Sequence, residues 1–197
     1  ATILYRQNRA TDANAQLEIL LVAEPRNPSY RNLMAAALSR FGEHERAIAV
    51  YEGILKDHSG QPKTWMSYGH TLRAVGRQED CIRAYRKSIS HAPNLGESYW
   101  SLANLKTFRF DPADVEAMQA QLGRTSGLSS EDRFHFHFAL GKSFEDEGNY
   151  GESFRHYEIG NRLRRESIEY DADELSDKIA RAKSLFTRDF FDARVGQ

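Results

Sequence analysis

Apolar and small side chains recur along this chain with a period of 34 residues. Block 62–95 shows the pattern most fully, with Trp65, Gly69, Leu72, Gly76, Cys81, Tyr85 and Pro93. Block 28–61 repeats it as Ala35, Leu38, Gly42, Ala47, Tyr51 and Ile54. Residues 1–27 fit the end of a further unit, with Ala13, Leu17, Leu20 and Pro25 in matching places. A helical segment flanks each turn, so the period predicts an array of stacked helical hairpins.

The next unit, 96–129, departs from the pattern at its turn. Phe110 stands where the other units carry glycine or, in the first unit, Asn8. Asp111 is a good N-cap for a new helix, followed by Pro112 in the first turn and Asp114 three residues after the cap. We therefore expect the hairpin to survive here with an altered angle.

A polar connector, 123–130, delays the following unit by four residues, so that the frame resumes at 134–167. Ser129 and Asp132 form a variant of the capping box for the helix that follows. The connector is the place where we expect regular stacking to break and a flexible joint to lie.

A final helix is expected to begin near Asp171. It carries apolar side chains at spacings of four, three and four, namely Leu175, Ile179, Ala182 and Phe186. This stripe predicts a capping helix that covers the last hairpin, followed by a linker to residue 197. We group 1–129 as one array and 130–197 as its continuation in the same solenoid.

Small side chains at fixed places explain how the helices would approach closely. We expect Ala35, Gly69, Ala103 and Gly141 to lie within hairpins, with Tyr51, Tyr85 and Tyr157 filling the space between helices. A larger side chain forced into such a place costs about 1–3 kcal/mol. Cys81 fits the same logic as a small packing residue, not a nucleophile.

The totals exclude several classes of protein. The chain has 197 residues, a net charge of −1, 40% hydrophobic residues and one cysteine. These values fit one elongated soluble domain without a disulfide framework or a thiolate metal site. They favour neither nucleic-acid nor membrane binding. We expect a cytoplasmic protein, although the chain begins inside a repeat and an N-terminal targeting sequence is therefore not addressed.

No motif supports catalysis, cofactor binding or metal binding. Leu140-Gly-Lys-Ser143 resembles the end of a phosphate-binding loop, but Phe136 stands where that loop needs glycine. His135 and His137 are two residues apart on a helix, a spacing that does not suit a pair of metal ligands, and we expect both to be partly exposed. Arg162, Arg164 and Arg165 fit a basic helix C-terminus better than a phosphate site.

The pattern of Trp, Leu-Gly, Tyr, Ala, Tyr and Pro at this period resembles the tetratricopeptide repeat, or TPR. The resemblance implies an all-α superhelical solenoid whose first helices line a concave groove. Carried over by position, the candidates for binding a protein or peptide segment are Asn32, Arg40, Lys63, His70, Arg73, Trp100, Asn104 and Phe108. The basic residues among them favour an acidic segment. The alternative is that they form an ordinary hydrophilic helix face.

TPR proteins that bind chaperones carry a Lys/Asn/Lys/Arg clamp for a C-terminal dicarboxylate. Ala36 occupies the place of the clamp asparagine. This departure argues against that particular function.

Residues 134–191 also show a narrower resemblance, to the TPR region that precedes the catalytic domain of bacterial TPR-sulfotransferases. It is carried by Ala139-Leu-Gly-Lys142, Tyr150-Gly-Glu-Ser-Phe154, Gly160-Asn-Arg-Leu-Arg164 and Phe190-Phe191. It would make this chain an accessory, substrate-positioning region attached to a catalytic domain beyond Gln197. The chain carries none of the catalytic residues itself.

The leading hypothesis is a non-catalytic protein-interaction scaffold, and the sulfotransferase accessory region is the alternative. Self-association through the open first unit is a third prediction. The sequence identifies neither the partner nor the oligomeric state.

Overall fold

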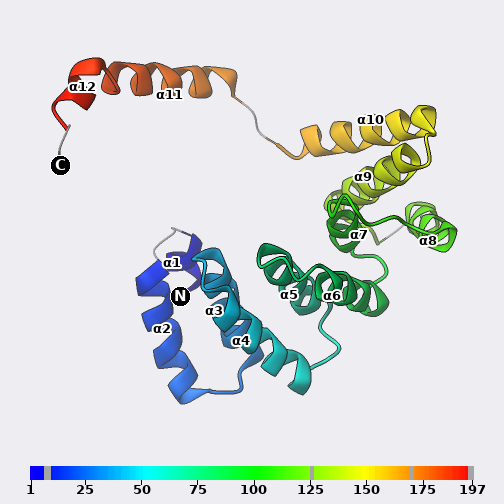
Figure 1. The fold of residues 1–197 in the computed structure, drawn as a ribbon, viewed down its shortest axis with the longest axis horizontal. Helices are drawn as coiled ribbons and strands as arrows, with labels where there is room; N and C mark the ends of the chain where they lie inside the picture. The colour runs from blue at the N-terminus through cyan, green and yellow to red at the C-terminus, as the bar shows by residue number, and fades with distance from the viewer. Residues whose placement is uncertain (7–9, 125–126, 169–170, 195–197) are drawn as a thin grey trace.

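The computed structural model describes residues 1–6, 10–124, 127–168 and 171–194, and within these ranges every regular element is an α-helix. The helices follow one another along a curved array (Figure 1). Their bounds are α1 Thr2–Arg6, α2 Ala10–Ala23, α3 Pro28–Arg40, α4 His44–Asp57, α5 Pro62–Ala74, α6 Gln78–His91, α7 Gly96–Ala103, α8 Pro112–Leu122, α9 Ser130–Asp146, α10 Tyr150–Glu166, α11 Ala172–Leu185 and α12 Arg188–Asp192. The all-α solenoid predicted from the sequence is confirmed.

Three tightly packed hairpins form the body of the array: α3 with α4, α5 with α6, and α9 with α10. Each reverses direction at a glycine, namely Gly42, Gly76 and Gly148, whose φ angles are 83°, 78° and 76°. Residues with a side chain rarely adopt this left-handed conformation, so glycine permits the turn without strain.

The core is divided among successive helices and not gathered in one place. Leu17, Tyr51 and Ile54 belong to a cluster that joins α2, α3 and α4. A second cluster around Leu72 and Tyr85 joins α4 to α7, and a third around Tyr99, Met118, Phe136 and Leu140 joins α7, α8 and α9. Each cluster is built by neighbouring elements only, which is the packing expected of a repeat array.

The divergent unit does not form the hairpin that the sequence predicts. Helix α7 packs mainly against α9, whereas α8 packs on α9 and lies at the side of the array (Figure 1). Gly96 allows this close approach, because a Cβ atom there would lie 2.3 Å from the backbone oxygen of Asp132. The backbone N–H of Gly96 also donates a hydrogen bond to Asp132 Oδ1 at 3.0 Å. Residues of α7 and α8 still face the core, but α9, and not α8, is the main packing partner of α7.

An ion pair attaches α8 to the preceding unit. Arg86 of α6 donates to both carboxylate oxygens of Asp114, at 2.7 Å for the Nη2–Oδ2 pair. Asp114 is buried and is also part of the capping box formed with Asp111, which confirms the predicted start of this helix.

The connector before α9 shows its predicted cap. Ser129 Oγ accepts a hydrogen bond from the backbone N–H of Asp132 at 3.0 Å. The flexible joint predicted over 123–130 includes residues 125 and 126, which lie outside the described residues, as does Asn8 of the first predicted turn.

The predicted C-terminal helix is present as α11, but the contact expected of a capping helix is not made. None of the described residues of α11 or α12 is buried, and Leu175 and Ile179 are 46% and 47% exposed. Figure 1 shows these two helices set apart from the array. Residues 195–197 of the predicted linker lie outside the described residues. None of the helices in the described part combines the length and apolarity needed to cross a lipid bilayer.

Candidate functional site

A hollow of about 630 Å³ lies between the first helices of two successive hairpins, α3 and α5. Leu33 and Ala36 contribute apolar surface from α3, and Lys63 and Ser67 contribute polar surface from α5. The hollow is open to solvent at the residues where the sequence places the groove. Its complete lining is Asn32, Leu33, Ala36, Tyr51, Gly60, Gln61, Pro62, Lys63, Thr64 and Ser67.

Asn32 is largely engaged within the protein. Its amide nitrogen donates to the Pro28 carbonyl at 2.9 Å and to Gln61 Oε1 at 3.3 Å. Its amide oxygen lies 3.0 Å from the Thr64 hydroxyl. These bonds link α3 to the start of α5, so Asn32 fixes the spacing of the two groove helices as well as lining the hollow.

A second, smaller hollow of about 240 Å³ brings together two other predicted residues, Arg73 and Asn104. It lies where the ends of α5 and α7 approach each other, and Gln78 and Lys106 also line it. Arg73 and Asn104 are exposed, as is Arg40 at the end of α3. The two predicted arginines, Arg40 and Arg73, therefore lie at the C-terminal ends of α3 and α5, whereas Lys63 lies at the start of α5.

His70 is a groove residue by position but contributes no positive charge at neutral pH. Its Nδ1 lies 2.7 Å from the Tyr85 hydroxyl, and the two rings meet edge to face. Burial, assisted by the nearby Arg73 guanidinium, lowers the pKa of His70 to about 4. Although Nε2 lies 3.9 Å from Glu97 Oε1, a neutral imidazole makes this contact polar and not an ion pair. The expectation that His70 adds to a basic groove is thus corrected.

The two predicted aromatic anchors lie in different surroundings. Trp100 of α7 is half-buried against Phe138 of α9, with ring centroids 5.3 Å apart. Phe108 lies beyond the end of α7, which stops at Ala103. It packs edge to face on Phe110, with the Arg86 guanidinium 5.2 Å from its ring centre. Phe108 therefore helps hold the loop on α6 and does not belong to the row of first helices.

The histidines of α9 are buried, contrary to the partial exposure expected from the sequence. His135 and His137 are each 9% exposed. His137 Nδ1 lies 2.9 Å from Nδ1 of His156 on α10, and burial lowers the pKa of both residues, that of His137 to about 4. Within the described residues, no group of three or more His, Cys, Asp or Glu side chains is placed to hold a metal ion. His137 and His156 therefore form a neutral, hydrogen-bonded contact between α9 and α10.

Cys81 is fully buried, and burial raises the pKa of its thiol. This environment suits a small packing residue, not a reactive thiolate. The structure thus supports the role expected of Cys81 from its place in the repeat.

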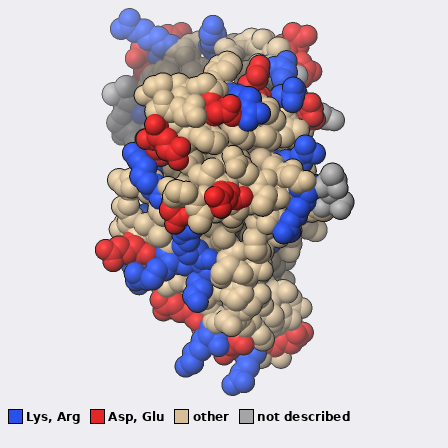
Figure 2. Space-filling model, turned by 90° about the vertical axis from the view of Figure 1, so that its right-hand side faces the viewer, with Lys and Arg blue, Asp and Glu red and all other residues tan. Residues whose placement is uncertain are grey.

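Charge is mixed over the surface on the side of α8, α9 and α10. Figure 2 shows lysine and arginine side chains interspersed with aspartate and glutamate on that face, without a broad region of one sign. A strong field over this face would be needed to gather a polyanion, and the visible pattern does not provide one.

Sequence reasoning missed a third hollow, which lies on a different face of α5. It is formed by α4, α5 and α6 and contains Trp65 and Tyr68. The period identified Trp65 as a structural landmark but did not single out Tyr68. The period gave no signal that Trp65 and Tyr68 line a hollow between α4 and α6, the second helices of two successive hairpins.

Comparison with known proteins first defines the class. Residues 1–62 match the family model described as tetratricopeptide repeat. Together with the observed array of hairpins, this match shows a TPR-type solenoid.

Individual relatives agree with that class. Over 70 residues, the chain is 31% identical to the small glutamine-rich tetratricopeptide repeat-containing protein 2 of Mycosarcoma maydis. The match covers 36% of this chain and spans only 20% of the length of that relative.

Several solved structures share the fold. A crystal structure of MamA has a TM-score of 0.60 at 12% identity, with 85% of this chain and 95% of that chain covered. A MamA fragment from Desulfovibrio magneticus RS-1 gives 0.59 at 18% identity, covering 85% and 93%. The C-terminal part of a TPR repeat-containing protein from Cytophaga hutchinsonii gives 0.59 at 15% identity, covering 82% and 62%. These matches support the TPR resemblance, but they lend no support to the narrower resemblance to TPR-sulfotransferases.

Proposed function

We propose that this chain is a protein-interaction scaffold that holds an acidic peptide segment along the first helices of its hairpins. The tetratricopeptide repeats support the general role. The observation that carries the specific proposal is the 630 Å³ hollow between α3 and α5, where successive repeats offer apolar and polar side chains side by side.

The chemistry of the hollow suggests the kind of segment. Leu33 and Ala36 provide contact surface for small apolar side chains, while Lys63 stands exposed at the rim. Arg40 and Arg73 add exposed cations further along the same row of helices. An extended segment with carboxylates near one end would meet apolar surface and positive charge in register.

Charge reversal at the ends of the groove helices tests the proposal. Fluorescein-labelled acidic peptides are titrated against the wild type and an Arg40→Glu/Arg73→Glu variant, with anisotropy as the readout. We expect the variant to bind about 10-fold more weakly, or ~1.4 kcal/mol, because two attractive contacts become repulsive. Raising the salt concentration should weaken wild-type binding as well.

A matched control reverses two exposed arginines outside the groove, Arg181→Glu/Arg188→Glu, with the same change in net charge. It should bind like the wild type. Equal affinities of the wild type and the Arg40→Glu/Arg73→Glu variant would remove the groove assignment. Self-association, attachment to a catalytic domain and a cytoplasmic location stay predictions from the sequence alone.

A further inference from the structure

A third hollow, the outer pocket, lies on a face of α5 different from the groove. It has a volume of about 460 Å³, is enclosed by α4, α5 and α6, and is mainly apolar. Its apolar surface comes from Leu55 of α4, Trp65 and Tyr68 of α5, and Ala84 of α6. Two successive repeats therefore build it jointly, as they do the groove.

The aromatic walls of the outer pocket are held in place by hydrogen bonds. The Trp65 indole N–H donates to the Ser59 carbonyl at 2.7 Å, and the Tyr68 hydroxyl donates to Glu52 Oε1 at 2.8 Å. The two rings meet edge to face with centroids 6.2 Å apart. Burial raises the pKa of Tyr68 to about 12, so its hydroxyl keeps the proton that it donates. Rings fixed in this way lose little entropy when a ligand packs on them.

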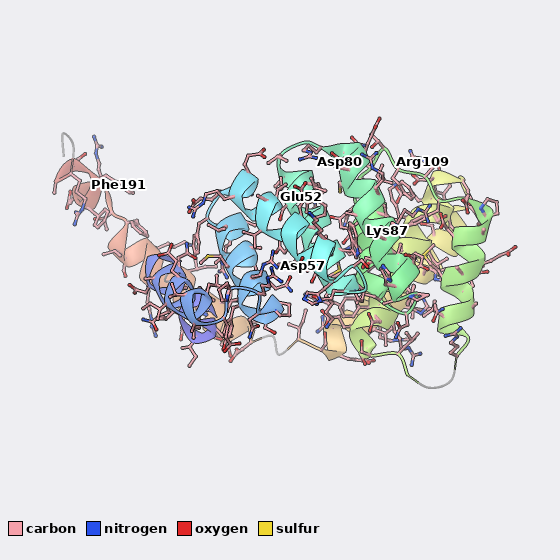
Figure 3. All side chains as sticks on the ribbon, turned by 90° about the horizontal axis from the view of Figure 1, so that it is seen from below. Glu52, Asp57, Asp80, Lys87, Arg109 and Phe191 are labelled. Atoms are coloured by element: carbon pink, nitrogen blue, oxygen red, sulfur yellow. The ribbon has the colours of Figure 1, made fainter. Side chains whose placement is uncertain are left out.

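The acidic groups at the rim already have hydrogen-bond or ion-pair partners within the protein. Glu52 accepts the Tyr68 hydrogen bond, and Asp80 is paired with Arg77 and Arg83. Arg83 also lies 3.9 Å from Glu79. Figure 3 shows Glu52 on α4 and Asp80 on the neighbouring α6.

Two lysines at the rim have no such partner. Lys56 of α4 and Lys87 of α6 line the pocket and are exposed, and their ammonium groups make no hydrogen bond or ion pair with another described residue. Figure 3 shows Lys87 on α6, the helix that also carries Asp80. The rim thus offers two lysine ammonium groups that no carboxylate of the described residues engages, around an apolar floor.

We propose that the outer pocket is a second protein-docking site, for an acidic segment that inserts one leucine-like side chain between α4 and α6. The side chain packs on Trp65 and Tyr68, and flanking carboxylates pair with Lys56 and Lys87. A buried apolar anchor surrounded by charge-complementary contacts is the usual arrangement of an interaction hot spot. The volume is also within the range of about 300–1,000 Å³ found for ligand pockets. This site is separate from the groove, so the scaffold would hold two partner segments on two faces.

The test uses a blocked, fluorescein-labelled peptide in which one leucine is flanked on both sides by aspartates. Anisotropy gives its affinity for the full chain, and the indole N–H signals in ¹⁵N NMR spectra give the location. The chain has two tryptophans. Because Trp65 lines the outer pocket and Trp100 lies on α7, we expect the Trp65 signal to shift on binding and the Trp100 signal to stay.

Charge reversal by Lys56→Glu/Lys87→Glu should weaken binding at least about 10-fold, and so should replacement of the peptide leucine by serine. The matched control Lys178→Glu/Lys183→Glu carries the same charge change on α11 and should bind like the wild type. The groove variant Arg40→Glu/Arg73→Glu should also retain binding, which separates this proposal from the previous one. Absence of saturable binding, or equal affinities of the Lys56→Glu/Lys87→Glu variant and its control, would overturn the outer-pocket assignment.

Discussion

At the scale of single residues, the array depends on aromatic rings that lie directly on glycine backbones. A Cβ atom at Gly69 would lie 2.6 Å from the Tyr85 ring, and one at Gly141 would lie 2.8 Å from the Tyr157 ring. Tyr85 is fully buried and its hydroxyl is bonded to His70, so its ring has no space into which to move. The glycines are therefore required by packing, not by backbone conformation.

Substitution of Gly69 by alanine should lower the free energy of unfolding. Overpacking against Tyr85 costs about 1–3 kcal/mol, which exceeds or offsets the gain of up to about 1 kcal/mol from the higher helix propensity of alanine. Gly151 of α10 is the matched control, because a Cβ atom there meets nothing within 4 Å. Gly151→Ala should stabilise the protein slightly. Urea denaturation followed by circular dichroism measures both, and a Gly69→Ala variant as stable as Gly151→Ala would contradict the packing argument.

At the scale of elements, the α9–α10 hairpin is joined by a buried polar contact. The His137 and His156 rings lie 5.1 Å apart, and Phe144 stacks on His156. Burial disfavours the protonated form of both histidines and so lowers the pKa of each below its usual value. Burial opposes the first protonation of the pair, and a second protonation would also remove the acceptor nitrogen from the hydrogen bond.

Acidification should therefore weaken the protein. The pKa of His137 is about 4 in the folded chain against 6.5 for the free side chain, so the unfolded state binds more protons between these values. The stability is fully present above pH 6.5 and is lost as the pH falls toward 4. Each unit of lowered pKa corresponds to about 1.4 kcal/mol, and we expect a loss of about 2 kcal/mol between pH 7 and 4.5.

Urea denaturation across this pH range measures the loss, and amide exchange in α9 and α10 locates it. A His137→Leu/His156→Leu variant removes both titrating groups from the hairpin and should show a shallower pH dependence. His70 and His135, whose pKa values burial also lowers, would contribute to the dependence that remains. Identical pH profiles for the wild type and the double variant would rule out the pair as the source.

At the scale of the whole molecule, stability comes from successive contacts between neighbours, and α11 stands outside this chain of contacts. Its apolar residues are about half exposed, and α10 likewise exposes Tyr150 and Phe154, each at 71%. The described structure therefore leaves exposed apolar side chains on α10 and on α11, the two helices that the sequence predicts to be in contact.

Removal of residues 169–197 should change the thermal stability of the remaining array little. Because no described residue of α11 or α12 is buried, the midpoint temperature should move by no more than about 2 °C. Differential scanning calorimetry of the full and shortened chains measures this shift. A fall of about 5 °C or more would instead show that α11 covers α10 in solution, as a capping helix does.

The period of 34 residues by itself determined the helical hairpins, because turn glycines and small packing residues have strong local requirements. The left-handed turn requires glycine at position 76, and the close approach of the Tyr85 ring requires glycine at position 69. Both glycines recur at fixed places in the repeat, so the sequence alone reveals them. The same period placed Asn32 and Lys63 beside one hollow and Arg73 and Asn104 beside another.

Only the tertiary structure decided which helices pair once the period breaks, since that choice depends on contacts between distant residues. Gly96 lets α7 approach α9, and Arg86 holds α8 aside through Asp114. Phe108 lies beyond the end of α7 and packs near Arg86, His137 meets His156 in the interior, and no described residue of α11 is buried. Local sequence patterns specify a helix and its turn. The burial and the protonation state of a side chain depend instead on the residues that pack against it in the folded chain.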